Sequence, residues 1–113
     1  MRDAKVQAEV DELTNGLFAE SSIDYLGFWE IVAIVRRKFS FFSEKEQREI
    51  VIYVVKGLIT LGLVPFNFKQ NPDGSYSTVI WPARGPEFAG ARIRKEWNAL
   101  RRDPTPAEIC WFK

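Results

Sequence analysis

The stretch SEKEQREIVIYVVKGLITLG, residues 43–62, decides the fold, because its pattern predicts a buried central helix. Ser43 and Glu46 have the spacing of a capping box, and Gly62 stands where a helix would end. Apolar residues occupy almost every side of this helix and leave only a narrow polar stripe, which consists of Lys45, Glu49, Tyr53, Lys56 and Thr60. Other elements must therefore cover most of the helix.

Two further helices are predicted before this stretch. The first, from residue 3 onward, has apolar residues at helical spacing: Val6, Val10, Leu13 and Leu17. Asn15 and Gly16 tolerate the left-handed conformation and favour its end. Ser22 or Asp24 is expected to cap the second helix, whose apolar face contains Phe28, Val32, Val35 and Phe39.

The pattern after Gly62 is typical of strands. Residues 63–69 and 75–81 flank the sequence NPDG at 71–74, which is a strong turn signal, so a β-hairpin is expected near 63–81. Pro65 has no backbone N–H, and this favours an edge position for the first strand.

A fourth helix is predicted to begin at Pro86 and to end before Pro104. Thr105 and Glu108 form a second potential capping box, which predicts a short helical turn before the apolar residues 109–112. Such an apolar end should be docked on the core. We therefore expect a small, mainly helical α+β domain of about four helices and one β-hairpin, in winged-helix-like order. It would be a single domain over residues 1–113, with an acidic helix over 1–20 and a core over 23–112.

Charge and cysteine content limit the environment of the protein. Sixteen basic and fifteen acidic residues leave a net charge of +1, so no global field attracts nucleic acid or an anionic membrane. Residues 1–24 nevertheless contain six acidic residues against two basic ones. Cys110 is the single cysteine, which permits no internal disulfide and indicates a reducing compartment. No segment resembles a signal peptide or a membrane span, and we expect a cytoplasmic protein.

Several kinds of chemistry lack their usual residues. The sequence contains no histidine, the commonest general base and metal ligand, and one cysteine cannot build a thiolate zinc site. The glycines match neither dinucleotide-binding nor P-loop spacing. Acidic residues at the start of the central helix are explained by the helix dipole. We therefore expect no enzyme activity, no catalytic residue, no cofactor and no metal.

The order of the elements also raises the hypothesis of a winged-helix regulator that binds nucleic acid. The central helix would then be the recognition helix, but its first turn carries Glu44, Glu46 and Glu49, a poor surface for phosphates. A basic side of the fourth helix is the remaining candidate for this hypothesis, and it consists of Arg92, Arg94, Lys95, Arg101 and Arg102. Solvation of an exposed helix side is the simpler interpretation of these residues.

The segment IRKEWNALRRDPTPAEICWF, residues 93–112, resembles the ending shared by a group of small bacterial proteins. Their pattern is EW, a spacer, arginine, an acidic residue and proline, then an acidic-apolar-x-Trp-Phe close, matched here by Glu96, Trp97, Arg102, Asp103, Pro104, Glu108, Ile109, Trp111 and Phe112. This group is similar to immunity proteins of contact-dependent growth inhibition systems, and its members often occur beside polymorphic toxins. The resemblance spans residues 23–112 and implies a bacterial immunity protein that inhibits a cognate toxin domain by protein–protein interaction.

A nuclease is the toxin we expect, because an enzyme that grips phosphates is cationic and would be attracted to acidic side chains. The candidate toxin-binding residues are Glu9, Asp11, Glu12, Glu20 and Asp24. Their alternative interpretation is the solvated side of the first helix. Tyr53, on the polar stripe, and Trp81, between a strand end and Pro82, are secondary candidates, although burial is the simpler expectation for Trp81. Trp29 and Trp97 lie on apolar stripes and are expected in the core.

Overall fold

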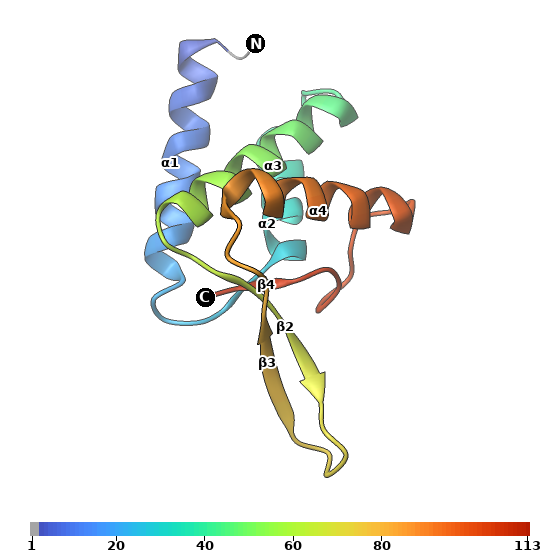
Figure 1. The fold of residues 1–113 in the computed structure, drawn as a ribbon. Coiled ribbons are helices and arrows are strands. Elements are labelled where there is room, and N and C mark those ends of the chain that lie inside the picture. Colours follow the sequence, from blue (N-terminus) through green and yellow to red (C-terminus); the bar gives the residue numbers. More distant parts are fainter. Residues whose placement is uncertain (1–2) are drawn as a thin grey trace.

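The computed structural model describes residues 3–113 and shows a small α+β domain, as predicted. Its helices are α1 (Ala4–Glu20), α2 (Phe28–Lys38), α3 (Glu44–Thr60) and α4 (Gly85–Leu100). Its strands are β1 (Leu26–Gly27), β2 (Pro65–Gln70), β3 (Tyr76–Ile80) and β4 (Trp111–Phe112). The helices gather at one end of the molecule, and the hairpin of β2 and β3 projects from the other end (Figure 1).

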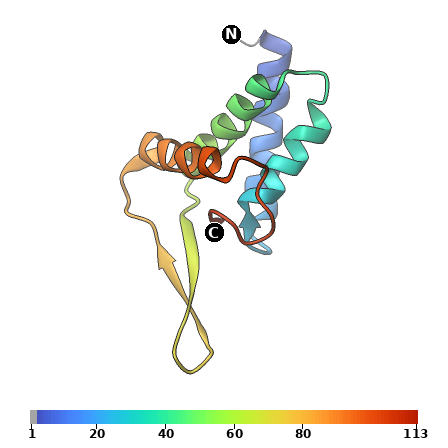
Figure 2. The same cartoon turned by 90° about the vertical axis from the view of Figure 1, so that its right-hand side faces the viewer.

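Helix α3 is the centre of the helical layer, because α1, α2 and α4 all pack against it. The predicted capping box is formed: Ser43 Oγ accepts from the backbone N–H of Glu46, and the Glu46 carboxylate accepts from the backbone N–H of Ser43. Figure 2 shows α3 between α1 and α4. Within the predicted polar stripe, Lys56 is half-buried and the other residues are exposed, so the prediction of a covered helix with one open side is confirmed.

The strands form one antiparallel sheet in the order β1-β4-β2-β3. Strand β4 lies in its interior, where Phe112 is opposite Leu26 and Pro65, and Trp111 is opposite Gly27 and Phe66. The predicted docking of the apolar end is therefore confirmed, as a central strand. The hairpin is also confirmed, and Asn71 closes its tip by donating its backbone N–H to the carbonyl of Ser75, 2.7 Å away.

Two predicted helix ends are wrong. Helix α1 continues through Asn15 and Gly16, because the buried Leu17 in the next turn holds it against the core. Neither Ser22 nor Asp24 caps α2. The hydroxyl of Ser22 donates to the carbonyl of Ala19 at the end of α1, and the residues that follow pair with β4, which delays α2 until Phe28.

Two predictions for the second half of the chain also need correction. Pro65 does not mark an edge strand, because β2 lies between β4 and β3. Proline is tolerated there as the first residue of the strand, where its carbonyl accepts from the N–H of Trp81. Thr105 and Glu108 do bond to each other, but no helical turn follows, since Ala107 and Ile109 have positive φ values of 73° and 70°.

The segment before β4 is clamped by Glu108. Its carboxylate accepts from the Arg102 guanidinium at 2.6 and 2.8 Å and from the backbone N–H of Thr105 at 2.7 Å. These bonds, with the Arg102 bonds contributing most, lower the pKa of Glu108 from 4.5 to about 2. These bonds of Glu108, which we call the clamp, thus fix the turn that precedes Trp111 in the sheet.

We expect this clamp to weaken in acid. A carboxyl whose pKa is lowered by folding stabilises the folded state above its unfolded pKa, and this contribution is lost as the pH falls from about 4.5 to about 2. NMR signals of residues 105–111 should therefore titrate in this window. Glu108→Gln, which has no carboxylate, should remove this titration and leave the acid titrations elsewhere in place. An unchanged titration in the variant would contradict the clamp.

Candidate functional site

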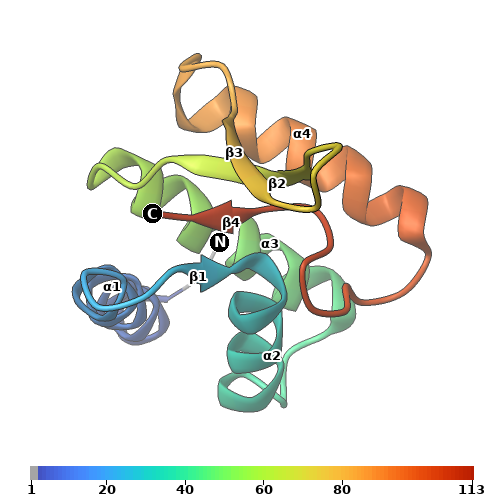
Figure 3. The same ribbon diagram turned by 90° about the horizontal axis from the view of Figure 1, so that it is seen from below.

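The sheet has two different faces. Leu26 and Phe112 point toward the helices and belong to the hydrophobic core. Side chains alternate along a strand, so those of Trp111 and Phe66 point to the opposite face. Gly27, which is in register with Trp111, leaves space on that face. Seen from below in Figure 3, helices α3 and α4 lie behind the strands, so neither of these two helices covers the second face.

Aromatic side chains fill the second face, which we call the aromatic face: Tyr25, Trp29, Phe66, Phe68 and Trp111. Their rings form a continuous series, with centroids 4.6 Å apart for Trp29 and Trp111, 5.5 Å for Trp111 and Phe68, and 5.1 Å for Phe66 and Tyr25. Most of these contacts are edge-to-face, the favoured geometry for aromatic pairs. Tyr25 and Phe68 remain 43% and 40% exposed, Trp29 and Trp111 are half-buried, and Phe66 is fully buried beneath its neighbours. The face is therefore ordered, and it is open to a partner at Tyr25 and Phe68.

Gly27 gives this face its shape. A Cβ atom at this position would lie 2.1 Å from Cζ3 of Trp29, so the Trp29 ring occupies the space above the glycine. The prediction that Trp29 belongs to the core is wrong, because the ring is half-buried on the outer face, against Trp111. Trp97, by contrast, is 1% exposed and belongs to the core as predicted.

Three acidic residues, Glu20, Asp24 and Glu30, adjoin the aromatic face beside Tyr25, and we call them the acidic rim. Together with Ser21, Tyr25 and Leu26 they line a hollow of about 140 Å³. The pKa of Glu30 is raised, first by partial burial and then by the charge of Asp24, with a smaller contribution from Glu20. The acidic rim is therefore a place where like charges repel and where a cation from a partner would be favoured.

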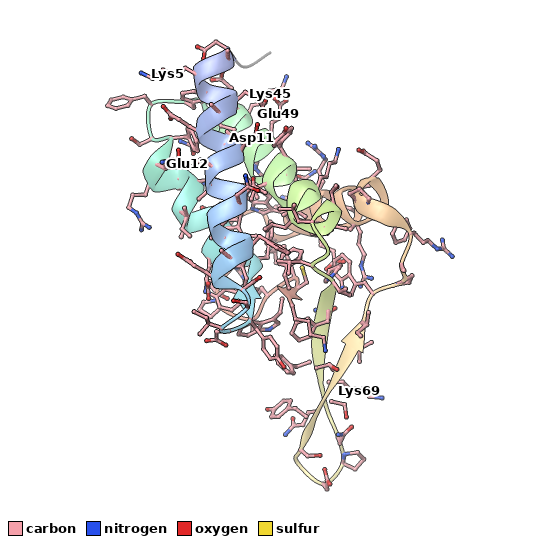
Figure 4. The ribbon with its side chains drawn as sticks, turned by 90° about the vertical axis from the view of Figure 1, so that its left-hand side faces the viewer. Lys5, Asp11, Glu12, Lys45, Glu49 and Lys69 are labelled. Carbon is pink, nitrogen blue, oxygen red and sulfur yellow. The ribbon has the colours of Figure 1, made fainter. Side chains whose placement is uncertain are left out.

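The predicted acidic candidates do not form one surface. Glu20 and Asp24 belong to the acidic rim, whereas Asp11 lies with Tyr53 in a groove of about 600 Å³ between α1, α3 and the start of α4. The Tyr53 hydroxyl is 3.3 Å from the Asp11 carboxylate. Figure 4 shows Asp11 on the side of α1 that faces α3, whereas Glu12 lies on the other side of α1 and points away from α3. Glu9 is half-buried, and Glu12 is exposed.

Trp81 is not available to a partner. The residue is 4% exposed, its indole N–H donates to Asn67 Oδ1 at 2.6 Å, and the Arg92 guanidinium lies 3.7 Å from its ring centroid. The possibility of partial exposure beside Pro82 is therefore wrong, and burial is the outcome. Trp81 closes the end of the hairpin against α4.

The basic residues are partly engaged within the fold. Arg92 pairs with Glu96, and Arg102 pairs with Glu108. Arg36, in the basic last turn of α2, bonds Glu44, Asp103 and Gln47, and so ties α2 to α3 and to the segment after α4. These contacts leave Arg94, Lys95 and Arg101 as the exposed cations of the predicted basic side of α4.

Neither an accessible thiol nor a cluster of metal ligands is found among the described residues. Cys110 is buried, which raises the pKa of its thiol and disfavours the thiolate that a nucleophile needs. Within residues 3–113, no group of three or more acidic or cysteine side chains is placed to hold a metal ion. In the same range, every helix is too short or too polar to cross a membrane.

Comparisons with protein-family models, curated proteins and solved structures found no match for this chain.

Proposed function

We propose that this protein is a bacterial immunity protein that binds a cognate toxin domain, a nuclease, and blocks it in the cytoplasm by direct contact. The contact surface would be the aromatic face together with the acidic rim. The proposal combines the resemblance of residues 93–112 to immunity-associated proteins with a surface of contacting, partly exposed aromatic rings.

The observation that carries this proposal is the aromatic face, whose rings at Tyr25 and Phe68 are partly exposed. Contacting aromatic rings lose little conformational freedom on binding, and Tyr and Trp are the residue types enriched in binding hot spots. The rings of Tyr25 and Phe68 are already held in place by Phe66. A partner would therefore gain contact area at a small entropic cost.

The acidic rim supports a cationic partner such as a nuclease. Glu30 is crowded by Asp24 and Glu20, and its raised pKa reflects the cost of holding these charges together. A lysine or arginine that a nuclease uses to bind phosphate would relieve this repulsion. Binding there would also remove that cation from its nucleic-acid substrate.

Co-expression tests the proposal directly. If a large secreted exoprotein is encoded directly upstream, its C-terminal domain would be produced in bacteria with or without this chain. We expect growth arrest by the toxin domain alone and normal growth when the chain is present. Continued arrest in the presence of folded chain would contradict the immunity function.

Charge reversal distinguishes a contribution of the acidic rim from one of the acidic residues earlier in α1. Asp24→Lys with Glu30→Lys should slow association with the toxin domain by about tenfold at low salt, and the effect should shrink as salt is added. The matched control is Glu9→Lys with Glu12→Lys, which has the same change in charge and lies on α1. Stopped-flow association rates provide the measurement. Equal slowing by both pairs would show that only net charge matters, and no slowing by the first pair would exclude the acidic rim.

The alternative of a nucleic-acid-binding regulator has less support. The element order is winged-helix-like, but α3 is packed by α1, α2 and α4, and its exposed first turn carries Glu44 and Glu46. The exposed cations on the basic side of α4 and Arg37 and Lys38 at the end of α2 are what support this alternative. A salt-dependent shift of random duplex DNA by micromolar protein would favour it, and absence of binding at low salt would eliminate it.

A further inference from the structure

Strand β3 is an edge strand with an open side. Within residues 3–113 it pairs with β2 alone, in a regular register from Gln70 opposite Tyr76 to Phe66 opposite Ile80. The N–H of Trp81 donates to Pro65, and the N–H of Asn71 donates to Ser75. Because hydrogen bonding alternates along an antiparallel strand, Tyr76, Thr78 and Ile80 turn their backbone N–H and C=O groups outward.

This edge has none of the protection that natural sheets usually give to open edges. Proteins block edge strands with charged residues, prolines, bulges or a covering element. The sequence of β3, YSTVI, contains no charged residue, glycine or proline, and all of its residues are exposed. Figure 2 shows the hairpin standing clear of the helices, so nothing in the described chain covers the edge.

We propose that the outer edge of β3 pairs antiparallel with β3 of a second copy of this chain, independently of the toxin-binding function. The residues of β3 are complementary to themselves about Thr78. With the two-fold axis at Thr78, Tyr76 of each copy lies opposite Ile80 of the other, and Thr78 lies opposite Thr78. Aromatic–β-branched and Thr–Thr pairs are favourable across antiparallel strands.

Charge and exposure favour a second copy as the occupant. Pairing two identical charged edges would place like charges opposite each other, but β3 has no charge to repel its copy. Tyr76 and Ile80 are 66% and 54% exposed and lie on the same side of the hairpin as Phe66 and Phe68. The pairing would therefore bury these side chains and join the two aromatic faces into one sheet.

The paired edge is short, so the dimer should be weak. Interfaces well below the usual 1,200–2,000 Å² are typical of weak association, and we expect a dissociation constant on the order of 100 μM. The protein would be a monomer in dilute solution and a dimer at high concentration. This concentration dependence makes the inference measurable with the isolated chain.

Sedimentation equilibrium of the wild-type chain and of charge variants at Thr78 tests the inference. Thr78→Lys and Thr78→Glu each place like charges on the two-fold axis and should weaken self-association by about threefold to tenfold. An equimolar mixture of the two variants should restore association, because opposite charges then meet. Gln70→Lys is the control: it adds the same charge on the same side of the hairpin but on β2, and should associate like the wild type.

A wild-type chain that stays monomeric up to about 1 mM would overturn the inference and leave the edge for a strand of a partner protein. Self-association of both Thr78 variants with the same affinity as the wild type would also overturn the inference, because the dimer contact would then lie elsewhere. Neither result bears on toxin neutralisation, which the co-expression test measures separately. Restored association in the mixture would support pairing at Thr78, because a general loss of folding could not be rescued in this way.

Discussion

Replacing Trp97 with alanine should destabilise the protein by about 3–5 kcal/mol, the largest loss of stability that we expect from one substitution. Trp97 is 1% exposed, its ring makes an edge-to-face contact with Phe28, and the Arg48 guanidinium lies 4.1 Å from its ring centroid. Alanine would remove these contacts and leave a cavity between α4, α2 and α3. Urea unfolding followed by circular dichroism measures the change in the free energy of unfolding.

Trp97→Phe is the matched control for this prediction. The Trp97 indole N–H is buried and has no hydrogen-bond partner among residues 3–113, and this absence costs stability. Phenylalanine keeps a ring in the site and removes the unpaired donor, so it should cost about 2 kcal/mol or less. A loss as large as that of the alanine variant would contradict our view of this core position.

Replacing Tyr25 or Phe68 with alanine should weaken toxin binding by about 30-fold each, equivalent to about 2 kcal/mol at a binding hot spot. Both rings are partly exposed at the open part of the aromatic face and are ordered by contacts with each other and with Phe66. Truncation would remove the anchor and loosen its neighbour. Isothermal titration calorimetry with the toxin domain measures the affinity.

Phe41→Ala controls for loss of an exposed aromatic ring. Phe41 is fully exposed between α2 and α3 and is outside the aromatic face. Its replacement should leave the affinity within about twofold of the wild type. Equal losses at Phe41 and Phe68 would indicate non-specific hydrophobic contact, and unchanged affinity of the Tyr25 and Phe68 variants would exclude the aromatic face as the binding surface.

The main helices and the hairpin were predictable because their signals are local. The capping box of Ser43 and Glu46, the apolar periodicity of residues 43–62 and the turn at 71–74 each depend on residues close together in the sequence. The two-residue strands β1 and β4 are too short to show alternation. Their pairing joins residues that are far apart in the sequence, and this long-range contact also displaced the start of α2.

The aromatic face was missed for the same reason. Its rings come from β1, the start of α2, β2 and β4, and only the sheet order brings them to one side. The periodicity of α2 places Trp29 at an apolar position of the helix. Because Gly27 has no side chain, however, the Trp29 ring packs over it on the outer face of the sheet. One signal was present: Phe66 and Phe68 alternate with polar residues, which places both rings on one side of the hairpin.

The acidic candidate residues were predicted from the excess of negative charge in residues 1–24, and this prediction is only partly useful. The excess of acid in residues 1–24 is real, but its members do not share one site. Asp11 lines the groove, Glu20 and Asp24 belong to the acidic rim, and Glu9 and Glu12 belong to neither. Glu30 follows the acidic segment in the sequence and lies in the first turn of α2. Only the fold places it beside Asp24.

An NMR titration of the tryptophan indole N–H signals with the toxin domain tests the binding surface most directly. Trp29 and Trp111 lie half-buried on the aromatic face, whereas Trp81 and Trp97 are buried. We predict that binding shifts or broadens the signals of Trp29 and Trp111 first and most, and that the signals of Trp81 and Trp97 serve as internal references. Shifts confined to Trp81 and Trp97, or tight binding that leaves all four signals in place, would contradict the aromatic face as the site of toxin recognition.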